Sequence, residues 1–220
     1  MTYTFHFADV FAYGDLLLRG AWLTIQLSAV STVLGLIVGI LGALGRNSQH
    51  APLRWLAGLY VELIRNTPFI VQLFFLYFGL AQIGVKMTAN QAALLAMVIN
   101  LGAYATEIVR AGIDAIARGQ WEAGLSLAMT RWQVFRHVVL LPALQKIYPA
   151  LTSQFIIVML GSSVVSQISA EELTFAGNFI QSRNFRSFEV YFVITAIYLL
   201  LSLGFRQVFR LIGARAFRRA

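Results

Sequence analysis

Five stretches of the chain are apolar over about 20 residues, the length at which an α-helix crosses the roughly 30 Å hydrocarbon core of a bilayer. These stretches are 20–44, 59–83, 91–109, 145–168 and 190–212. Inside lipid each backbone polar group must find its partner within its own segment, and no stretch alternates as the strands of a membrane barrel do. The pattern therefore predicts an all-α integral membrane protein, one domain over residues 1–220 with five transmembrane helices.

The amino-acid composition supports the prediction of a membrane protein. Hydrophobic residues make up 59% of the chain and charged residues 12%, with a mean hydropathy of +0.73, whereas soluble domains average about 45–50% and about 25%. The net charge of +8 would suggest nucleic acid in a soluble protein. In an apolar chain arginine gathers on the cytoplasmic face instead, so no nucleic-acid partner is expected. Cysteine is absent, which excludes disulfides and thiolate metal sites.

Lysine and arginine are distributed asymmetrically about the predicted helices. If the N-terminus lies outside and the C-terminus inside, the outer side holds four of these residues, Arg19, Lys86, Arg183 and Arg186. The inner side then holds eleven, namely Arg46, Arg54, Arg110, Arg118, Arg131, Arg136, Arg206, Arg210, Arg215, Arg218 and Arg219. This excess predicts that orientation. The first 19 residues carry Asp9 and Asp15 and no basic region, so no removable signal peptide is expected.

Residues 110–137 break the membrane pattern and are predicted to lie inside the cell. The segment is too long for a simple connection between bundle helices, and four of its apolar residues fall at helical spacing on one stripe, Trp121, Leu125, Ala128 and Trp132. Thr130 followed by Gln133 has the form of a capping box that begins the next helix. The short amphipathic helix either lies on the lipid surface or is presented to a cytoplasmic partner.

Motifs for catalysis are missing. There is no G-x-x-x-x-G-K-[ST] sequence to hold nucleotide phosphates and no G-x-S-x-G nucleophile elbow. The three histidines, His6, His50 and His137, lack metal-ligand spacing. The sequence therefore predicts neither an enzyme nor a cofactor bound by this chain.

Polar groups at membrane depth are the candidate functional residues. Glu62 and Arg65 lie on one face of the second predicted helix, close to Pro68, which bends a helix and frees a carbonyl. Broken helices at mid-membrane often hold transport substrates, but the two charges could equally form a stabilising pair at the boundary. A second polar zone contains Ser162, Ser163 and Gln167, and it could serve packing or a substrate path.

Gly35 and Gly39 form a G-x-x-x-G pattern in the first predicted helix, followed by Gly42. This pattern is common in membrane helices and indicates close helix packing.

Three motifs in order resemble one family. Residues 110–133, RAGIDAIARGQWEAGLSLAMTRWQ, resemble the EAA loop of ABC-importer permeases, and in particular the polar amino acid permeases of the histidine/glutamine type. Residues 62–79, ELIRNTPFIVQLFFLYFG, and 100–110, NLGAYATEIVR, are similar to the same family.

The resemblance implies a type I ABC importer permease fold in the bacterial cytoplasmic (inner) membrane. Two permease subunits, identical or paralogous, would form the pore, and two cytoplasmic ABC ATPase subunits would drive it with ATP and Mg. An extracytoplasmic solute-binding protein would deliver the amino acid. The loop helix would be the coupling helix, with Glu122, Ala123 and Gly124 at the E-A-A positions, and Leu125 and Ala128 completing the ATPase-coupling segment.

The chain departs from the family at informative positions. Gly124 replaces an alanine, and Ala128 stands where a glycine would permit a tight turn. Leu160 and Gly161 replace a Lys-Asp pair whose acid helps to hold cationic substrates in some relatives. This favours a neutral or acidic amino acid, and Arg65 would suit an anionic one. The competing interpretation is a passive channel or an accessory subunit of another membrane complex.

Overall fold

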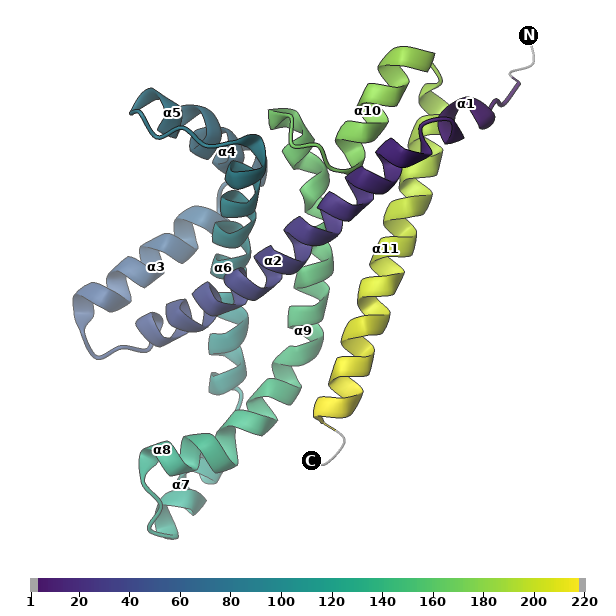
Figure 1. Ribbon diagram of the computed structural model, residues 1–220. Helices are drawn as coiled ribbons and strands as arrows, with labels where there is room; N and C mark the ends of the chain where they lie inside the picture. The colour runs from purple at the N-terminus through teal and green to yellow at the C-terminus, as the bar shows by residue number, and fades with distance from the viewer. Residues whose placement is uncertain (1–3, 218–220) are drawn as a thin grey trace.

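The computed structural model describes residues 4–217, and over this range the secondary structure is entirely helical (Figure 1). The elements in chain order are α1 (Ala8–Phe11), α2 (Gly14–Arg46), α3 (Ala51–Arg65), α4 (Phe69–Phe74), the π-helical turn η1 (Phe75–Gly79), α5 (Leu80–Gln82), α6 (Ala89–Asp114), α7 (Arg118–Ser126), α8 (Arg131–Val134), the π-helical turn η2 (Phe135–Val139), α9 (Leu140–Gly161), the 3-10 helix η3 (Ser162–Ile168), α10 (Leu173–Asn184) and α11 (Ser187–Ala216).

Four helices of the described chain are long and apolar enough to cross a membrane: α2, α6, the continuous helix from Arg131 to Ile168, and α11. A fifth crossing is present if α3 and α4–α5 together count as one broken span. The five-helix prediction is therefore confirmed in number, but the second helix is not the straight span 59–83. It consists of two helices bent by 110° at a break between Arg65 and Phe69.

Pro68 accounts for that break. It precedes α4 with an extended backbone at φ −64° and ψ 138°, and a proline disfavours the helical conformation for the residue before it. Because proline has no N–H, it fits the beginning of α4 without losing a hydrogen bond. The sequence suggested a bend at Pro68, and the structure shows that the two helices on either side of it are bent by 110°.

Several helix boundaries differ from the predictions. α6 continues past 109 to Asp114, and the fourth crossing begins at Arg131 instead of 145. The stretch between these two helices is 115–130, which lies within the predicted loop 110–137. The capping box at Thr130 and Gln133 is confirmed, with both reciprocal hydrogen bonds present. α10 was not predicted, and Arg218 and Arg219 of the charge count lie outside the described residues.

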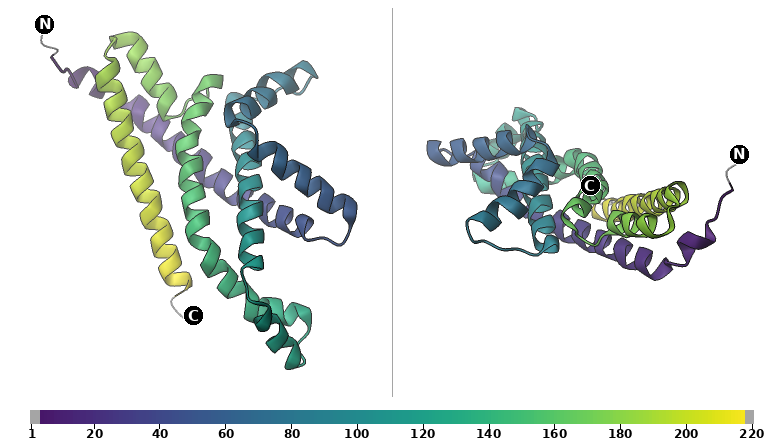
Figure 2. Two further views of the ribbon diagram at one scale, coloured as in Figure 1. Left: turned by 180° about the vertical axis from the view of Figure 1, so that it is seen from behind. Right: turned by 90° about the horizontal axis from the view of Figure 1, so that it is seen from above.

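The packing of α2 across α6 forms the centre of the molecule (Figures 1 and 2). Gly35, Gly39 and Gly42 face α6, and a Cβ added to Gly39 would come within 2.4 Å of the Ala105 Cβ. An added Cβ at Gly42 would collide with the Thr106 hydroxyl. The interpretation of the glycine pattern as a packing surface is confirmed, because only the absence of side chains lets the two backbones approach so closely.

A buried carboxylate joins three helices at the other end of α2. Glu172 is fully buried and accepts a hydrogen bond from the Phe175 N–H at 2.9 Å, which caps α10. The Thr24 hydroxyl of α2, at 3.4 Å, and the Tyr198 hydroxyl of α11 also donate to this carboxylate. Glu172 thereby links the beginning of α10 to α2 and α11.

α1 and the end of α11 lie at opposite ends of the molecule (Figure 1). α7 and α8 project at the end where α11 finishes, as Figure 1 and the left view of Figure 2 show. The segment 115–130 and the end of α11 therefore lie at the same end of the molecule.

We expect Gly39→Ala to lower the free energy of unfolding by about 1–3 kcal/mol, the usual cost of overpacking a tight interface. Gly204→Ala is the matched control, because no atom lies within 4 Å of a Cβ added there. Alanine is the better helix former by about 1 kcal/mol, so this control should be neutral or stabilising. Thermal unfolding of the purified protein in detergent measures both changes. Equal shifts for the two variants would contradict the packing role of Gly39.

Candidate functional site

The first candidate site is α7, which the rest of the chain presents at one end of the molecule (Figure 1). Gly124 is the buried residue of this helix, and a Cβ added there would come within 2.7 Å of the Val134 Cγ2. Trp121, one turn earlier, packs on the small cluster that contains Ile116, Val134 and Val139. The replacement of alanine by glycine at 124 therefore allows α7 to lie directly against α8.

The end of α7 is a left-handed turn. The N–H of Ala128 donates to the Leu125 carbonyl at 3.0 Å and the N–H of Met129 to the Gly124 carbonyl at 3.3 Å, which is the Schellman pattern of a helix C-terminus. Ala128 occupies its left-handed position with φ +59°. The tight turn that a glycine would permit is present despite the alanine, and Ala128 adopts the conformation that glycine would adopt without strain.

The structure separates the predicted coupling residues into two groups. Glu122, Ala123, Leu125 and Ala128 are exposed, whereas Gly124 is buried. The predicted apolar stripe through Trp121, Leu125, Ala128 and Trp132 does not form one continuous face. The turn at 128 ends α7, so Leu125 and Trp132 are exposed and only Trp121 packs inward. The exposed surface of α7 therefore includes the acidic Glu122 and the apolar Leu125.

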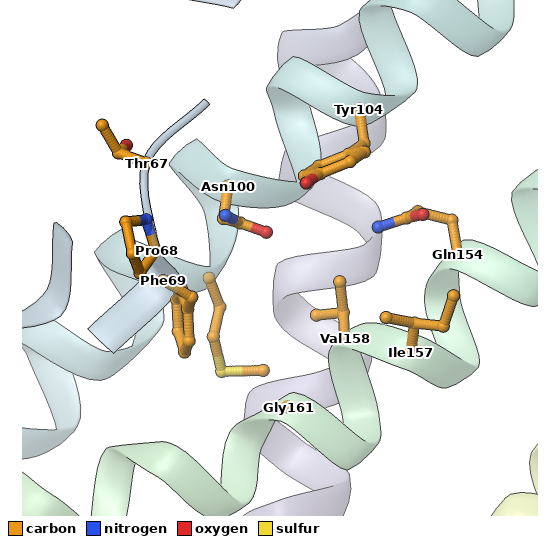
Figure 3. Close-up of a pocket in the computed structure, with 10 residues that line it drawn as sticks. Thr67, Pro68, Phe69, Asn100, Tyr104, Gln154, Ile157, Val158 and Gly161 are labelled. Atoms are coloured by element: carbon orange, nitrogen blue, oxygen red, sulfur yellow. The ribbon is translucent and has the colours of Figure 1, made fainter. Parts of the chain in front are cut away.

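The second candidate site is a pocket of about 460 Å³ beside the break in the second span (Figure 3). It is lined by the break, α6 and α9, through Thr67, Pro68, Phe69, Met97, Asn100, Tyr104, Gln154, Ile157, Val158 and Gly161. The side chains of Asn100, Tyr104 and Gln154 point toward the same space (Figure 3). The pocket thus combines apolar walls with neutral hydrogen-bonding groups and has no charged side chain in its lining.

Side chains satisfy the backbone at the break. The Gln72 amide nitrogen donates to the Ile64 carbonyl at 2.7 Å and to the Thr67 carbonyl at 3.0 Å. The Asn100 amide nitrogen donates in turn to the Gln72 amide oxygen at 3.0 Å, linking α4 to α6. Gln72 therefore fixes one edge of the pocket and orients Asn100.

Among the predicted path residues, Arg65 contacts the side chain of a pocket residue. Its guanidinium carbon lies 5.4 Å from the centre of the Tyr104 ring, within the range of a cation–π contact. Glu62 accepts a hydrogen bond from Asn66 at 3.0 Å and forms no ion pair among residues 4–217. The alternative of a stabilising pair between Glu62 and Arg65 is therefore not observed.

The second predicted polar zone lies outside the pocket lining. The hydroxyls of Ser162 and Ser163 donate to the carbonyls of Met159 and Leu160 at 2.7 and 2.8 Å. Gln167 is exposed in η3. The sequence did not single out Asn100, Tyr104 or Gln154. The first two stand inside the motif 100–110, which was a signal for them, whereas Gln154 has no local signal.

An ion cluster lies between the pocket and the connection to α7. Glu107 contacts Arg46 of α2 at 3.4 Å and Arg110 at 2.9 Å, and Arg110 also contacts Asp114 at 3.0 Å. These pairs connect the ends of α2 and α6 in a partly buried site. The acidic groups at this end of the span are thus neutralised within the chain.

A multi-pass helical protein that holds a polar pocket beside a broken span and presents a short helix at one end has the architecture of a membrane transport subunit. The family described as "Binding-protein-dependent transport system inner membrane component" matches residues 31–218. The chain belongs to this family, the membrane permease components of ABC transporters, in which separate subunits hydrolyse ATP.

Named relatives agree with this assignment. The chain is 36% identical over 185 residues to the L-cystine transport system permease protein TcyB of Bacillus subtilis, covering 84% of this chain and 79% of the relative. It is 34% identical over 202 residues to the glutamine transport system permease protein GlnP of Escherichia coli, covering 91% and 92%.

Two solved structures have the same fold. A crystal structure of an amino acid ABC transporter with histidines superposes with a TM-score of 0.90 and 38% identity, covering 97% of this chain and 100% of that one. The inward-facing MetNI methionine ABC transporter matches with a TM-score of 0.70 and 24% identity, over 92% and 95%. This second likeness supports the fold alone.

We expect Gly124→Ala to push α7 away from Val134, because both γ-carbons of that short side chain lie within 3.0 Å of the added Cβ. Cleavage by protease within 115–130 should become faster in membrane vesicles that expose this side. Gly119→Ala, in the same helix with no atom within 4 Å, is the matched control and should not change cleavage. Val134→Ala combined with Gly124→Ala should restore protection, and failure of that rescue would contradict the contact.

Proposed function

We propose that this chain is the membrane-spanning permease subunit of an ATP-driven importer for an amino acid. The pocket carries the proposal, because it places two amides and a phenol beside a broken helix at the level of the spans. Binding sites of many transporters are built at such breaks, where polar backbone is tolerated only because it lines a cavity. The relatives are named as transport proteins for cystine, glutamine and amino acids, and these names support the same substrate class.

Substrate preference follows from the charges around the pocket. Asn100 and Gln154 can donate to and accept from an amino acid without favouring either sign of side chain. The cation of Arg65 lies against the Tyr104 ring at the edge of the pocket and repels a second cation. We therefore favour a neutral or acidic amino acid over a cationic one. In this proposal Arg65 and the pocket residues form the path, and Glu62, Ser162, Ser163 and Gln167 support its frame.

The topology and partners follow from the positions of α7 and the arginines. With the N-terminus outside and the C-terminus inside the bacterial cytoplasmic membrane, α7 faces the cytoplasm. Its exposed surface of Glu122, Ala123, Leu125 and Leu127 then docks on an ABC ATPase subunit. Two such ATPases, a second permease subunit that is identical or paralogous, and an extracytoplasmic solute-binding protein complete the importer.

The mechanism couples α7 to the pocket through rigid helices. ATP and Mg binding closes the ATPase dimer and draws the two coupling helices together. Because Gly124 fixes α7 to Val134 and the helix is continuous from Arg131 to Ile168, this motion rotates the wall that carries Gln154. The pocket then opens outward to accept substrate from the binding protein, and ATP hydrolysis returns it to the inward state.

We expect Glu122→Arg to reduce ATP-driven uptake by at least about tenfold, because the substitution reverses the charge that α7 presents to the ATPase across the interface. Uptake into proteoliposomes and ATP hydrolysis, both with loaded binding protein, measure the effect. Glu122→Gln is the matched control of similar size, and it should keep more activity. Unchanged uptake by Glu122→Arg would contradict the assignment of α7 as the coupling helix.

We expect Gln154→Glu to shift substrate preference toward arginine and lysine by about tenfold or more, the strength of a hydrogen bond to a charged group in a partly buried site. Competition for uptake between neutral, acidic and cationic amino acids measures this preference. Gln167→Glu makes the same change at an exposed position outside the pocket and should have no effect. An equal shift by both variants would contradict the position of the substrate site.

A passive channel or an accessory subunit remains the competing function, and one measurement separates them. The complex purified with its native partners in nanodiscs should hydrolyse ATP faster when loaded binding protein is added. Substrate flux without ATP, or the absence of a copurifying ATPase, would favour the competitor.

A further inference from the structure

A second hollow lies at the α7 end of the molecule, away from the pocket. It is a groove of about 360 Å³ between the ends of α2 and α6 and the helix that begins at Arg131. Aliphatic and aromatic side chains make up nearly the whole lining, and Asn47 at the end of α2 is its one polar residue. Leu44 and Trp132, at the edge of the groove, are 61% and 65% exposed.

The position of the groove at the α7 end of the molecule determines its depth in the membrane. If α7 faces the cytoplasm, as in the proposed function on which this inference rests, the groove lies within the inner leaflet. Trp132 and Asn47 are then at the level of the lipid headgroups, where tryptophan is typical. Leu36 and Leu151 lie nearer the middle of α2 and α9, and they line the part of the groove toward the bilayer centre.

Unpaired cations lie beside this groove. Residues 129–151 contain Arg131, Arg136, His137 and Lys146 and no acidic residue. Lys146 donates to the Ala115 carbonyl at 2.7 Å and so caps the end of α6. Arg131 and Arg136 are exposed and form no ion pair among residues 4–217.

Both arginines are neighbours of groove residues in the sequence. Arg131 directly precedes Trp132, and Arg136 directly follows Phe135. The carboxylates of Glu107 and Asp114 at this end are already held by Arg46 and Arg110. The mouth of the groove therefore carries net positive charge.

We propose that this groove binds an anionic phospholipid of the inner leaflet. Its acyl chains lie along Leu36, Ile40, Leu44 and Leu144, and its phosphate pairs with Arg131 and Arg136. Basic sites between helices on the cytoplasmic side suit such headgroups. An apolar helix of a second permease would cover the same aliphatic surface but would leave the two arginines without a counter-charge, whereas one phospholipid satisfies both.

The experiment uses the transporter with its ATPases in nanodiscs and a photoactivatable phosphatidylglycerol with the reactive group on its acyl chain. Mass spectrometry locates the labelled residues. We expect labelling within 140–151, displaced by unlabelled phosphatidylglycerol at least about fivefold better than by phosphatidylcholine, since each arginine near an anionic headgroup contributes about a fivefold preference. The double variant Arg131→Gln, Arg136→Gln should remove this preference.

Two controls make the result decisive. Arg54→Gln changes an exposed arginine of α3, outside the groove lining, and should keep the preference. Leu144→Trp fills the groove and should reduce labelling by either lipid without altering the arginines. Equal displacement by the two lipids, or labelling absent from 140–151 because a protein partner covers it, would overturn the proposal. Labelling is read on the permease itself, so it stands or falls separately from uptake and ATP hydrolysis.

Discussion

Satisfaction of backbone polar groups inside a lipid-facing protein is the constraint on which this structure depends. A span that stops at Arg65 and restarts at Phe69 leaves carbonyls that have no helical partner. Side chains supply the missing donors, since the Gln72 amide reaches the Ile64 carbonyl at 2.7 Å and the Thr67 hydroxyl reaches the Leu63 carbonyl at 2.7 Å. The polar residues near the break are therefore a condition for the pocket to exist, before any substrate enters it.

The α2–α6 contact and the Glu172 cluster hold the remaining helices around this break. Glycines at 35, 39 and 42 bring α2 within backbone distance of residues 101–106 of α6, and the same part of α6 carries Asn100 and Tyr104 of the pocket. Glu172 fixes α10 to α2 and α11 with hydrogen bonds in a buried site. A rigid frame of this kind lets a displacement at α7 reach the pocket without being absorbed by loose packing.

Charge is arranged in two different ways at the two working surfaces. Around Glu107 the opposite charges are paired within the chain. Along α8 the arginines have no internal partner among the described residues, so their counter-charge must come from outside the chain. No charged side chain is part of the pocket lining, so no lining residue would pair with a charge on the substrate.

Local signals in the sequence determined much of this protein: the number of crossings, the glycine packing surface, the capping box at Thr130 and the tight turn at Ala128. Each of these depends on residues within one or two helical turns, or on hydropathy summed along a segment. Pro68 located the break in the second span, but tertiary structure alone decided its angle of 110°, the burial of Glu172, and the meeting of Asn100 with Gln154 across the pocket. These features depend on contacts between residues far apart in the chain, which no local pattern encodes. The spacing of Glu62 and Arg65 allowed an ion pair between them. In the structure Glu62 accepts a hydrogen bond from Asn66, and Arg65 lies against the ring of Tyr104, which comes from another helix.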